Sequence, residues 1–335
     1  MSNSRRILEM LKSRADGDDE QFYTIALQVA AAEARQGHRE VAQQLRDAVE
    51  KARSATGTGQ TVAVPFAAPR GELLGVLEAR SPKHSLSDVV MSKTLRGQLD
   101  DVVREQSKRD WLREHAKTPS RKLLFLGPPG SGKTMTAEGL ASTLRIPLFV
   151  IRLDNLITRY MGETAAKLRL IFEEIGRRRA VYLFDEFDAL GANRGAGNDV
   201  AEMRRVLNSF LQFMEEPSAT DSLVVGATNY PNLLDRALLR RFDLVLPFSP
   251  PSDDEIRLVV KSNLRPMKYP NLAWKKIIHA AQGLSQAELV RAAEKAVKSA
   301  ILDQRNVLKT DDIIASIEER QTMREAFSGL EGKAR

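Results

Sequence analysis

Short apolar runs alternate with helical patterns through the middle of the chain. Between the runs, apolar residues recur every three to four positions, which is the spacing of an amphipathic helix. Because parallel strands need long crossover connections, this alternation predicts an α/β fold with a parallel, five-stranded sheet and helices on both faces. The runs are KLLFL at 122–126, LFVIR at 148–152, VYLF at 181–184, LVVGA at 223–227 and LVLPF at 244–248.

Helical periodicity without strand runs marks both ends of the chain. At the start, apolar positions predict three short amphipathic helices that Gly17 and Gly37 interrupt. We interpret this bundle either as a structural cap or as an adaptor for a partner or substrate. The stretch SATGTGQ at 54–60 is typical of a linker, and the periodicity beyond Pro250 and Pro251 predicts a helical lid. We therefore expect a helical bundle at 1–54, a linker at 55–84, a large α/β domain at 85–249 and a C-terminal helical lid at 250–335.

Composition excludes several kinds of chemistry. The 335 residues include no cysteine, which rules out disulfides, thiol nucleophiles, iron–sulfur clusters and cysteine-bound zinc. The net charge of +7, from 51 Lys and Arg against 44 Asp and Glu, is diffuse and supports nucleic-acid binding only weakly. No apolar run approaches the roughly 20 residues that cross a bilayer, and the start lacks the apolar core of a signal peptide. We therefore expect a cytoplasmic protein without membrane association.

The clearest chemical signal is GPPGSGKT at 127–134, which follows an apolar run and precedes a helical pattern. It satisfies the phosphate-binding pattern G-x-x-x-x-G-K-[ST], whose backbone N–H groups cradle phosphate oxygens at a helix N-terminus. In this pattern Lys133 contacts the β and γ phosphates of ATP, and Thr134 places its hydroxyl on Mg²⁺. The candidate nucleotide-binding residues are Gly127, Pro128, Pro129, Gly130, Ser131, Gly132, Lys133, Thr134 and Met135.

Two acidic residues end the third predicted strand. Asp185 and Glu186 follow the run VYLF, and the carboxyl ends of parallel strands form the edge where open sheets bind their ligands. We predict that Asp185 holds Mg²⁺, together with Thr134, and that Glu186 takes a proton from the water that attacks the γ phosphate.

The fourth and fifth predicted strands add weaker signals. Asn229 ends the fourth strand, where it can orient the attacking water, although Asn is also a common turn residue. Arg240 and Arg241 precede the fifth strand within DRALLRRFD. We interpret them either as an exposed basic pair or as an arginine finger that stabilises charge in the transition state.

The order GPPGSGKT, VYLFDE, GATN and LLRRFD resembles the AAA ATPases of the remodelling group that includes katanin, spastin and bacterial membrane-protease ATPases. The resemblance covers about residues 85–305. It implies that Arg240 and Arg241 reach the nucleotide of a neighbouring subunit and that the subunits form a ring, most often a hexamer. Relatives often separate the two arginines, so either could be the finger here; we favour Arg241, beside Phe242, with Arg240 as a second contact.

The resemblance also implies further site residues. Within TRYMGET at 158–164, Tyr160 and Met161 are similar to the pair that grips a threaded peptide in the central pore, and Arg194 falls where a second pore loop lies. In the lid, GLSQAEL is similar to the motif GxSGADL, with Gln286 in place of its glycine, and Ala287 fits that pattern. Asp88 and Val89 in LSDVV resemble the segment that packs on adenine.

These features together predict an ATP-hydrolysing ring that remodels, unfolds or threads protein substrates. One alternative is a nucleic-acid-associated ATPase, such as a loader or transposition helper, although no DNA-reading module is recognisable and nucleic acid is disfavoured as a partner. Another is a nucleotide-switched module that binds a partner. Because no protease motif is visible, degradation would need a separate polypeptide, and the layout resembles small bacterial AAA proteins that pair with a subtilisin-like serine protease.

Overall fold

The computed structural model divides the chain into two compact units, Met1–Ala63 and Val64–Arg335. It describes residues 25, 26, 29, 30, 41, 43, 47, 49, 73, 75–153, 156, 163–190, 197–218, 220–230 and 239–331, with only the backbone for 189, 190, 197–204 and 327–331. The described residues of the first unit are helical. The three-helix arrangement expected there otherwise lies outside the described residues, so that arrangement and the four expected domain boundaries stay predictions.

The second unit contains a six-stranded sheet in the order β1-β3-β4-β5-β2-β6. All five predicted strands are present and parallel, which confirms the expected α/β class. The structure adds a sixth strand, β1 (Glu78–Arg80), which pairs antiparallel with β3 inside the segment expected to be a linker. Its three residues form no apolar run because they lie on a partly exposed edge. The parallel strands are β2 (Lys122–Leu126), β3 (Leu148–Arg152), β4 (Val181–Asp185), β5 (Leu223–Thr228) and β6 (Leu244–Pro247).

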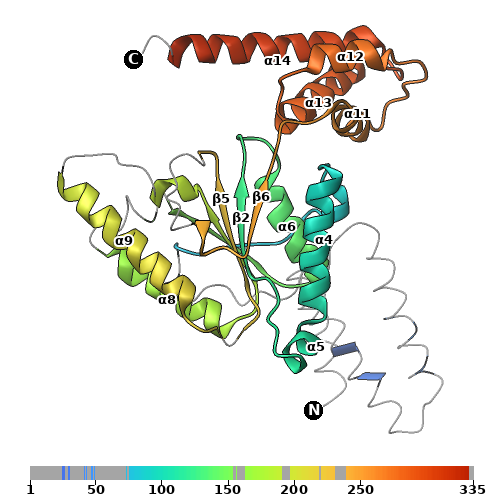
Figure 1. The fold of residues 1–335 in the computed structure, drawn as a ribbon. Coiled ribbons are helices and arrows are strands. Elements are labelled where there is room, and N and C mark those ends of the chain that lie inside the picture. The colour runs from blue at the N-terminus through green and yellow to red at the C-terminus, as the bar shows by residue number, and fades with distance from the viewer. Residues whose placement is uncertain are drawn as a thin grey trace. The chain divides into compact units, whose positions relative to one another are not determined.

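Helices cover both faces of this sheet, as Figure 1 shows. Helices α8 (Thr164–Arg177) and α9 (Gly197–Glu215) pack on one face, while α4 (Lys93–Ser107) and α6 (Lys133–Leu144) pack on the other. The strands supply alternate residues to the two cores, since Leu124 faces α8 and α9 whereas Leu123 and Phe125 face α4 and α6. The remaining short elements are the 3₁₀ helices η2 (Leu86–Asp88) and η3 (Phe187–Leu190), and α5 (Arg109–Glu114).

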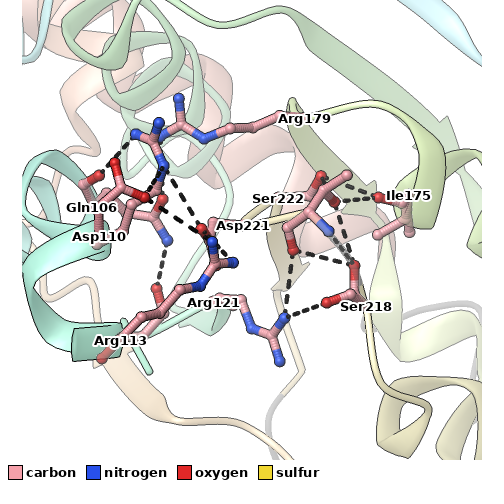
Figure 2. Close-up of polar contacts among 12 residues, drawn as sticks. Gln106, Asp110, Arg113, Arg121, Ile175, Arg179, Ser218, Asp221 and Ser222 are labelled. Carbon is pink, nitrogen blue, oxygen red and sulfur yellow. Dashed lines mark hydrogen bonds and ion pairs between the residues drawn. The ribbon is translucent and has the colours of Figure 1, made fainter. Parts of the chain in front are cut away.

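A polar network at the amino ends of the strands joins α5 to the loop before β5, through Arg113 and Asp221, and joins α4 to the loop before β4, through Gln106 and Arg179 (Figure 2). Its centre is Asp221, which is 4% exposed and forms ion pairs with Arg113 at 2.8 Å and with Arg109 at 3.6 Å. Nearby, the Ser222 hydroxyl donates to the carbonyls of Ile175 and Arg178 and so ties this loop to the end of α8. The network therefore fixes α5 on the sheet.

The predicted lid consists of four helices with their own hydrophobic core. They are α11 (Asp253–Ser262), α12 (Trp274–Ala281), α13 (Gln286–Leu302) and α14 (Thr310–Glu331). Reciprocal capping fixes the start of two of them, because Ser252 with Glu255 and Ser285 with Glu288 satisfy the first N–H groups of α11 and α13. Among the described helices, none combines the length and apolar character needed to cross a membrane.

Candidate nucleotide site

The glycine-rich loop connects β2 to α6, which begins at Lys133. Close packing requires glycine at Gly127, because a Cβ atom there would lie 2.3 Å from the backbone oxygen of Phe248. Gly130 has a φ of +75°, in the region that favours glycine. The loop is therefore held at the carboxyl edge of the sheet, with the first N–H groups of α6 behind it.

Lys133 is buried within this loop and makes three hydrogen bonds. Its Nζ donates to the carbonyl oxygens of Gly127 at 2.7 Å and Pro128 at 2.9 Å, and to Oδ1 of Asn229 at 2.8 Å. Burial lowers the pKa of Lys133 to about 8, against the opposing effect of Asp185 and Asp188. The lowered pKa means that the nearby carboxylates do not fully compensate the buried ammonium. The phosphates of a nucleotide would supply the missing negative charge.

Ser131 provides a test of whether the loop fits a phosphate group. Among the described residues, its Oγ is one of two buried side-chain polar atoms without a hydrogen-bond partner. Buried polar groups are otherwise paired, so such an atom indicates a ligand or water that completes it. Its position between Gly130 and Gly132, beside the α6 N-terminus, fits an anionic oxygen.

Thr134 and Asp185 converge across the site. The Thr134 hydroxyl donates to Oδ2 of Asp185 at 3.4 Å, although the two residues come from α6 and the end of β4. A hydroxyl and a carboxylate that meet beside a phosphate loop are the protein ligands that Mg²⁺ uses in phosphate sites. The residues present therefore fit a magnesium ion.

Glu186 has an unusual backbone conformation directly after Asp185. Its φ of +55° is rare for a residue other than glycine, and its N–H donates to Oδ1 of Asp185 at 3.0 Å. The side chain is 43% exposed and lies 3.9 Å from Arg152 at the end of β3. The turn directs Glu186 away from the strand line, and strained conformations of this kind cluster at functional sites.

Asp188 is a site residue that the sequence analysis missed. Its Oδ1 accepts hydrogen bonds from the Thr228 hydroxyl at 2.8 Å and from the Asn229 N–H at 3.3 Å. Asn229 in turn accepts from Lys133, so Asp188 holds the residue that contacts the lysine. The only sequence signal was a third acid, three positions after Asp185, which the sequence alone does not distinguish from a solvent-exposed acid.

Arg240 and Arg241 lie at the amino ends of the parallel strands, opposite the glycine-rich loop. Arg240 is exposed, and Arg241 forms an ion pair with Glu215 at the end of α9, where both side chains are about half exposed. Asp243 follows them and accepts hydrogen bonds from the N–H groups of Arg121 and Lys122, at the start of β2. The phosphate loop begins where β2 ends. The length of β2, about 15 Å at a strand rise of roughly 3.3 Å per residue, thus separates the arginines from their own loop.

The remaining candidates occupy different settings. Asp88 accepts hydrogen bonds from the N–H and hydroxyl of Ser85, which lower its pKa, so its carboxylate caps η2. Val89 is buried, and its Cγ1 lies 3.8 Å from the position of a Cβ on Gly132. Ala287 donates its N–H to the Gly130 carbonyl at 3.1 Å, so the lid contacts the loop. Three predicted pore-loop residues lie outside the described part of the chain, namely Tyr160, Met161 and Arg194.

Comparison with known proteins places this geometry in context. Residues 123–250 match the model of the ATPase family associated with various cellular activities (AAA). An uncharacterized AAA family ATPase, y4kL, from Sinorhizobium fredii is 33% identical over 312 residues, which covers 92% of this chain and 93% of that protein. The ATP-dependent zinc metalloprotease FtsH of Rickettsia felis is 34% identical over 203 residues, or 56% of this chain and 32% of that protein. The chain therefore spans about a third of that relative's length.

A crystal structure of the FIGL-1 AAA domain has the same fold. It superposes with a TM-score of 0.62 and 22% sequence identity, covering 81% of this chain and 98% of that one. The likeness supports the assignment of the α/β fold.

Proposed function

Since the chain belongs to the AAA family of ATPases, we propose that it works as a ring of like subunits that couples ATP hydrolysis to the remodelling of protein substrates. The observation that carries the proposal is the position of the arginines. Lys133, Thr134 and Asp185 gather at one edge of the sheet, and Arg240 and Arg241 lie at the other. A site that needs both sets is complete only between two molecules.

The geometry of the loop supports the following proposed chemistry. Lys133 and the N–H groups of 130–134 bind the β and γ phosphates, and Asn229, held by Asp188, positions the lysine ammonium. Thr134 and Asp185 would hold Mg²⁺, which would neutralise charge on the phosphate oxygens. Glu186, whose side chain is 43% exposed, is proposed as the general base that accepts a proton from the water attacking the γ phosphate.

Arg241, with Arg240 as a second contact, completes this site from a neighbouring subunit. In the single chain Arg241 pairs with Glu215, and this pair must open before the guanidinium reaches a neighbour. Exposed ion pairs contribute only about 0–1 kcal/mol, so the release costs little compared with the gain at a transition state. Because the two surfaces differ, the contact is head-to-tail. Such a contact builds either a ring or an open helical assembly, and we propose a ring of six subunits.

The substrate contact is proposed in the segment between β3 and α8. This segment follows β3 at the carboxyl ends of the parallel strands, where the nucleotide residues also lie, and its sequence contains Tyr160 and Met161. An aromatic ring and a flexible thioether pack against many side chains without selecting a sequence, as a grip on diverse peptides requires. Arg194 is proposed as a further contact to the threaded chain. The FtsH relative carries ATP-dependent proteolysis in its name, which supports a protein substrate.

A separate polypeptide would carry out any degradation. The sequence offers no protease motif, and we propose a subtilisin-like serine protease as the partner. Affinity purification of the full chain with ATP, followed by mass spectrometry, tests this point. Recovery of an unrelated partner in place of a serine protease would remove the pairing and leave the remodelling function untouched.

Stimulation of the ATPase distinguishes the proposed function from its alternative. Turnover should rise with an unfolded protein such as casein and stay constant with double-stranded DNA. Tyr160→Ala should keep the basal turnover and lose the response to casein, together with unfolding of a tagged fluorescent substrate. Stimulation by DNA alone would support the nucleic-acid-associated ATPase, and no response to either would support a nucleotide-switched binding module.

A further inference from the structure

The start of α13 rests directly on the phosphate loop. The N–H of Ala287 donates to the Gly130 carbonyl at 3.1 Å. A Cβ atom on Gly130 would lie 2.9 Å from the Ser285 hydroxyl and 3.0 Å from the Ala287 Cβ. The lid and the loop are therefore in contact where a nucleotide must enter and leave, and what holds this contact bears on nucleotide exchange.

Gln286 forms a second connection between the lid and the large domain. Its Nε2 donates to the carbonyl oxygen of Val90 at 3.0 Å, and its Oε1 lies 3.4 Å from the position of a Cβ on Gly132. The carboxamide thus spans the space between the segment before α4 and the phosphate loop. Glycine, which the related motif carries at this position, has no side chain that could do so.

Val90 is a fixed anchor on the large domain. Arg96 donates to the carbonyl oxygens of Leu86 at 2.6 Å and Val89 at 2.7 Å, which clamps the segment that ends at Val90 onto α4. The same segment packs tightly on α6, because a Cβ on Gly139 would lie 2.9 Å from the Leu86 Cα. The side chain of Val90 in turn packs against the hydrophobic core of the lid.

We propose that Gln286 is a positioning residue that latches the lid onto the large domain and so slows release of the bound nucleotide. The inference rests on the proposed nucleotide site. With the bond to Val90 made, the first turn of α13 stays on the loop and closes the exit from the phosphate cradle. With the bond lost, the Ala287–Gly130 hydrogen bond and the packing of the Val90 side chain against the lid core remain, and the lid opens more often.

The expected effect follows from the strength of one bond. A neutral hydrogen bond in a partly buried setting shifts an equilibrium by about 2- to 12-fold. The lid should therefore open about 2- to 12-fold more often without the Gln286 amide, and ADP should dissociate faster by the same factor. Association of ADP should change less than twofold, because the phosphate loop itself is intact.

The test compares Gln286→Met with Gln321→Met in the full chain. Methionine has nearly the volume of glutamine and no charge, so the change removes only the amide. Gln321 is a matched control, since its Nε2 donates to the Ala280 carbonyl at 2.6 Å, a similar bond that lies within the lid. Release of a fluorescent ADP analogue is followed by stopped flow. Hydrogen exchange of the Ala287 N–H is measured without nucleotide.

Faster ADP release and faster Ala287 exchange in Gln286→Met, with wild-type values in Gln321→Met, would support the latch. Wild-type release and exchange in Gln286→Met would overturn it, and ADP binding by that variant would show that the nucleotide site stands. Equal acceleration in both variants would also overturn it, because lid stability and not the bond to Val90 would then set the rate. If wild-type protein bound no ADP, the proposed site would fail, and the exchange measurement would still decide the latch.

Discussion

The position of Arg241 leads to a strict test of shared active sites. The perturbation is a pair of inactivating changes placed in separate molecules. Lys133→Ala removes the ammonium from the phosphate loop and should abolish ATP binding. Arg241→Ala keeps the loop intact and should lower turnover by about 10³- to 10⁵-fold, the usual contribution of an arginine finger.

The magnitude expected on mixing follows from the arrangement of the two edges. Arg241 cannot reach its own phosphate loop, because the length of β2 separates them, about 15 Å. In a random, equimolar mixture, a complete site forms where an Arg241→Ala subunit supplies the loop and its neighbour, a Lys133→Ala subunit, supplies the arginine. Head-to-tail contacts make this happen at about one interface in four, so turnover should recover to roughly a quarter of the wild-type rate.

The assay measures steady-state phosphate release against the mixing ratio at constant total protein. Each variant alone is the baseline, and Arg104→Ala, which removes an exposed arginine of α4 that pairs with exposed Asp101, is the matched arginine control for mixing with Lys133→Ala. Glu215→Gln frees Arg241 from its ion pair and should leave the recovery unchanged or slightly higher, since exposed pairs contribute little. A mixture that stays as inactive as its components, while both variants still assemble, would refute the shared site. Wild-type turnover in Arg241→Ala would do the same.

Three further predictions concern the site and the fold. Glu186→Gln should keep ATP bound and lower turnover by about 10²- to 10⁴-fold, because the general base is lost; binding and single-turnover measurements check this, and an active variant would place the base elsewhere. Asp221→Ala should lower the free energy of unfolding by roughly 1–3 kcal/mol, measured by denaturant titration. This loss is smaller than for a fully buried ion pair, because Arg109 and Arg113 are partly exposed. Gly97→Ala should stabilise α4 by up to about 1 kcal/mol, because no atom of another described element lies within 4 Å of its Cβ position. Gly139→Ala should instead destabilise the protein, because its Cβ would lie 2.9 Å from the Leu86 Cα. Equal melting temperatures for the two variants would contradict the close packing of η2 on α6.

The sequence alone determined the five parallel strands and the glycine-rich turn that follows the first of them. Buried parallel strands must be continuous apolar runs, and a tight turn that exposes N–H groups to an anion needs glycines at fixed spacing. These are local requirements, so KLLFL and GPPGSGKT carry them in a few adjacent residues. The sequence did not predict the edge strand β1, because its three partly exposed residues, which pair only with β3, form no apolar run.

Only the tertiary structure decided which distant side chains meet. No neighbouring residue in the sequence indicates that Asp188 accepts a hydrogen bond from Asn229, which in turn contacts Lys133. Likewise, none indicates that Gln286 reaches Val90, 196 positions away. The sequence contains Arg241, but the strand pairing of β6 with β2 puts that arginine at the edge opposite the loop. Hydrogen bonds and ion pairs depend on distances of a few ångströms between segments, and those distances exist only after the crossover connections have folded over the sheet.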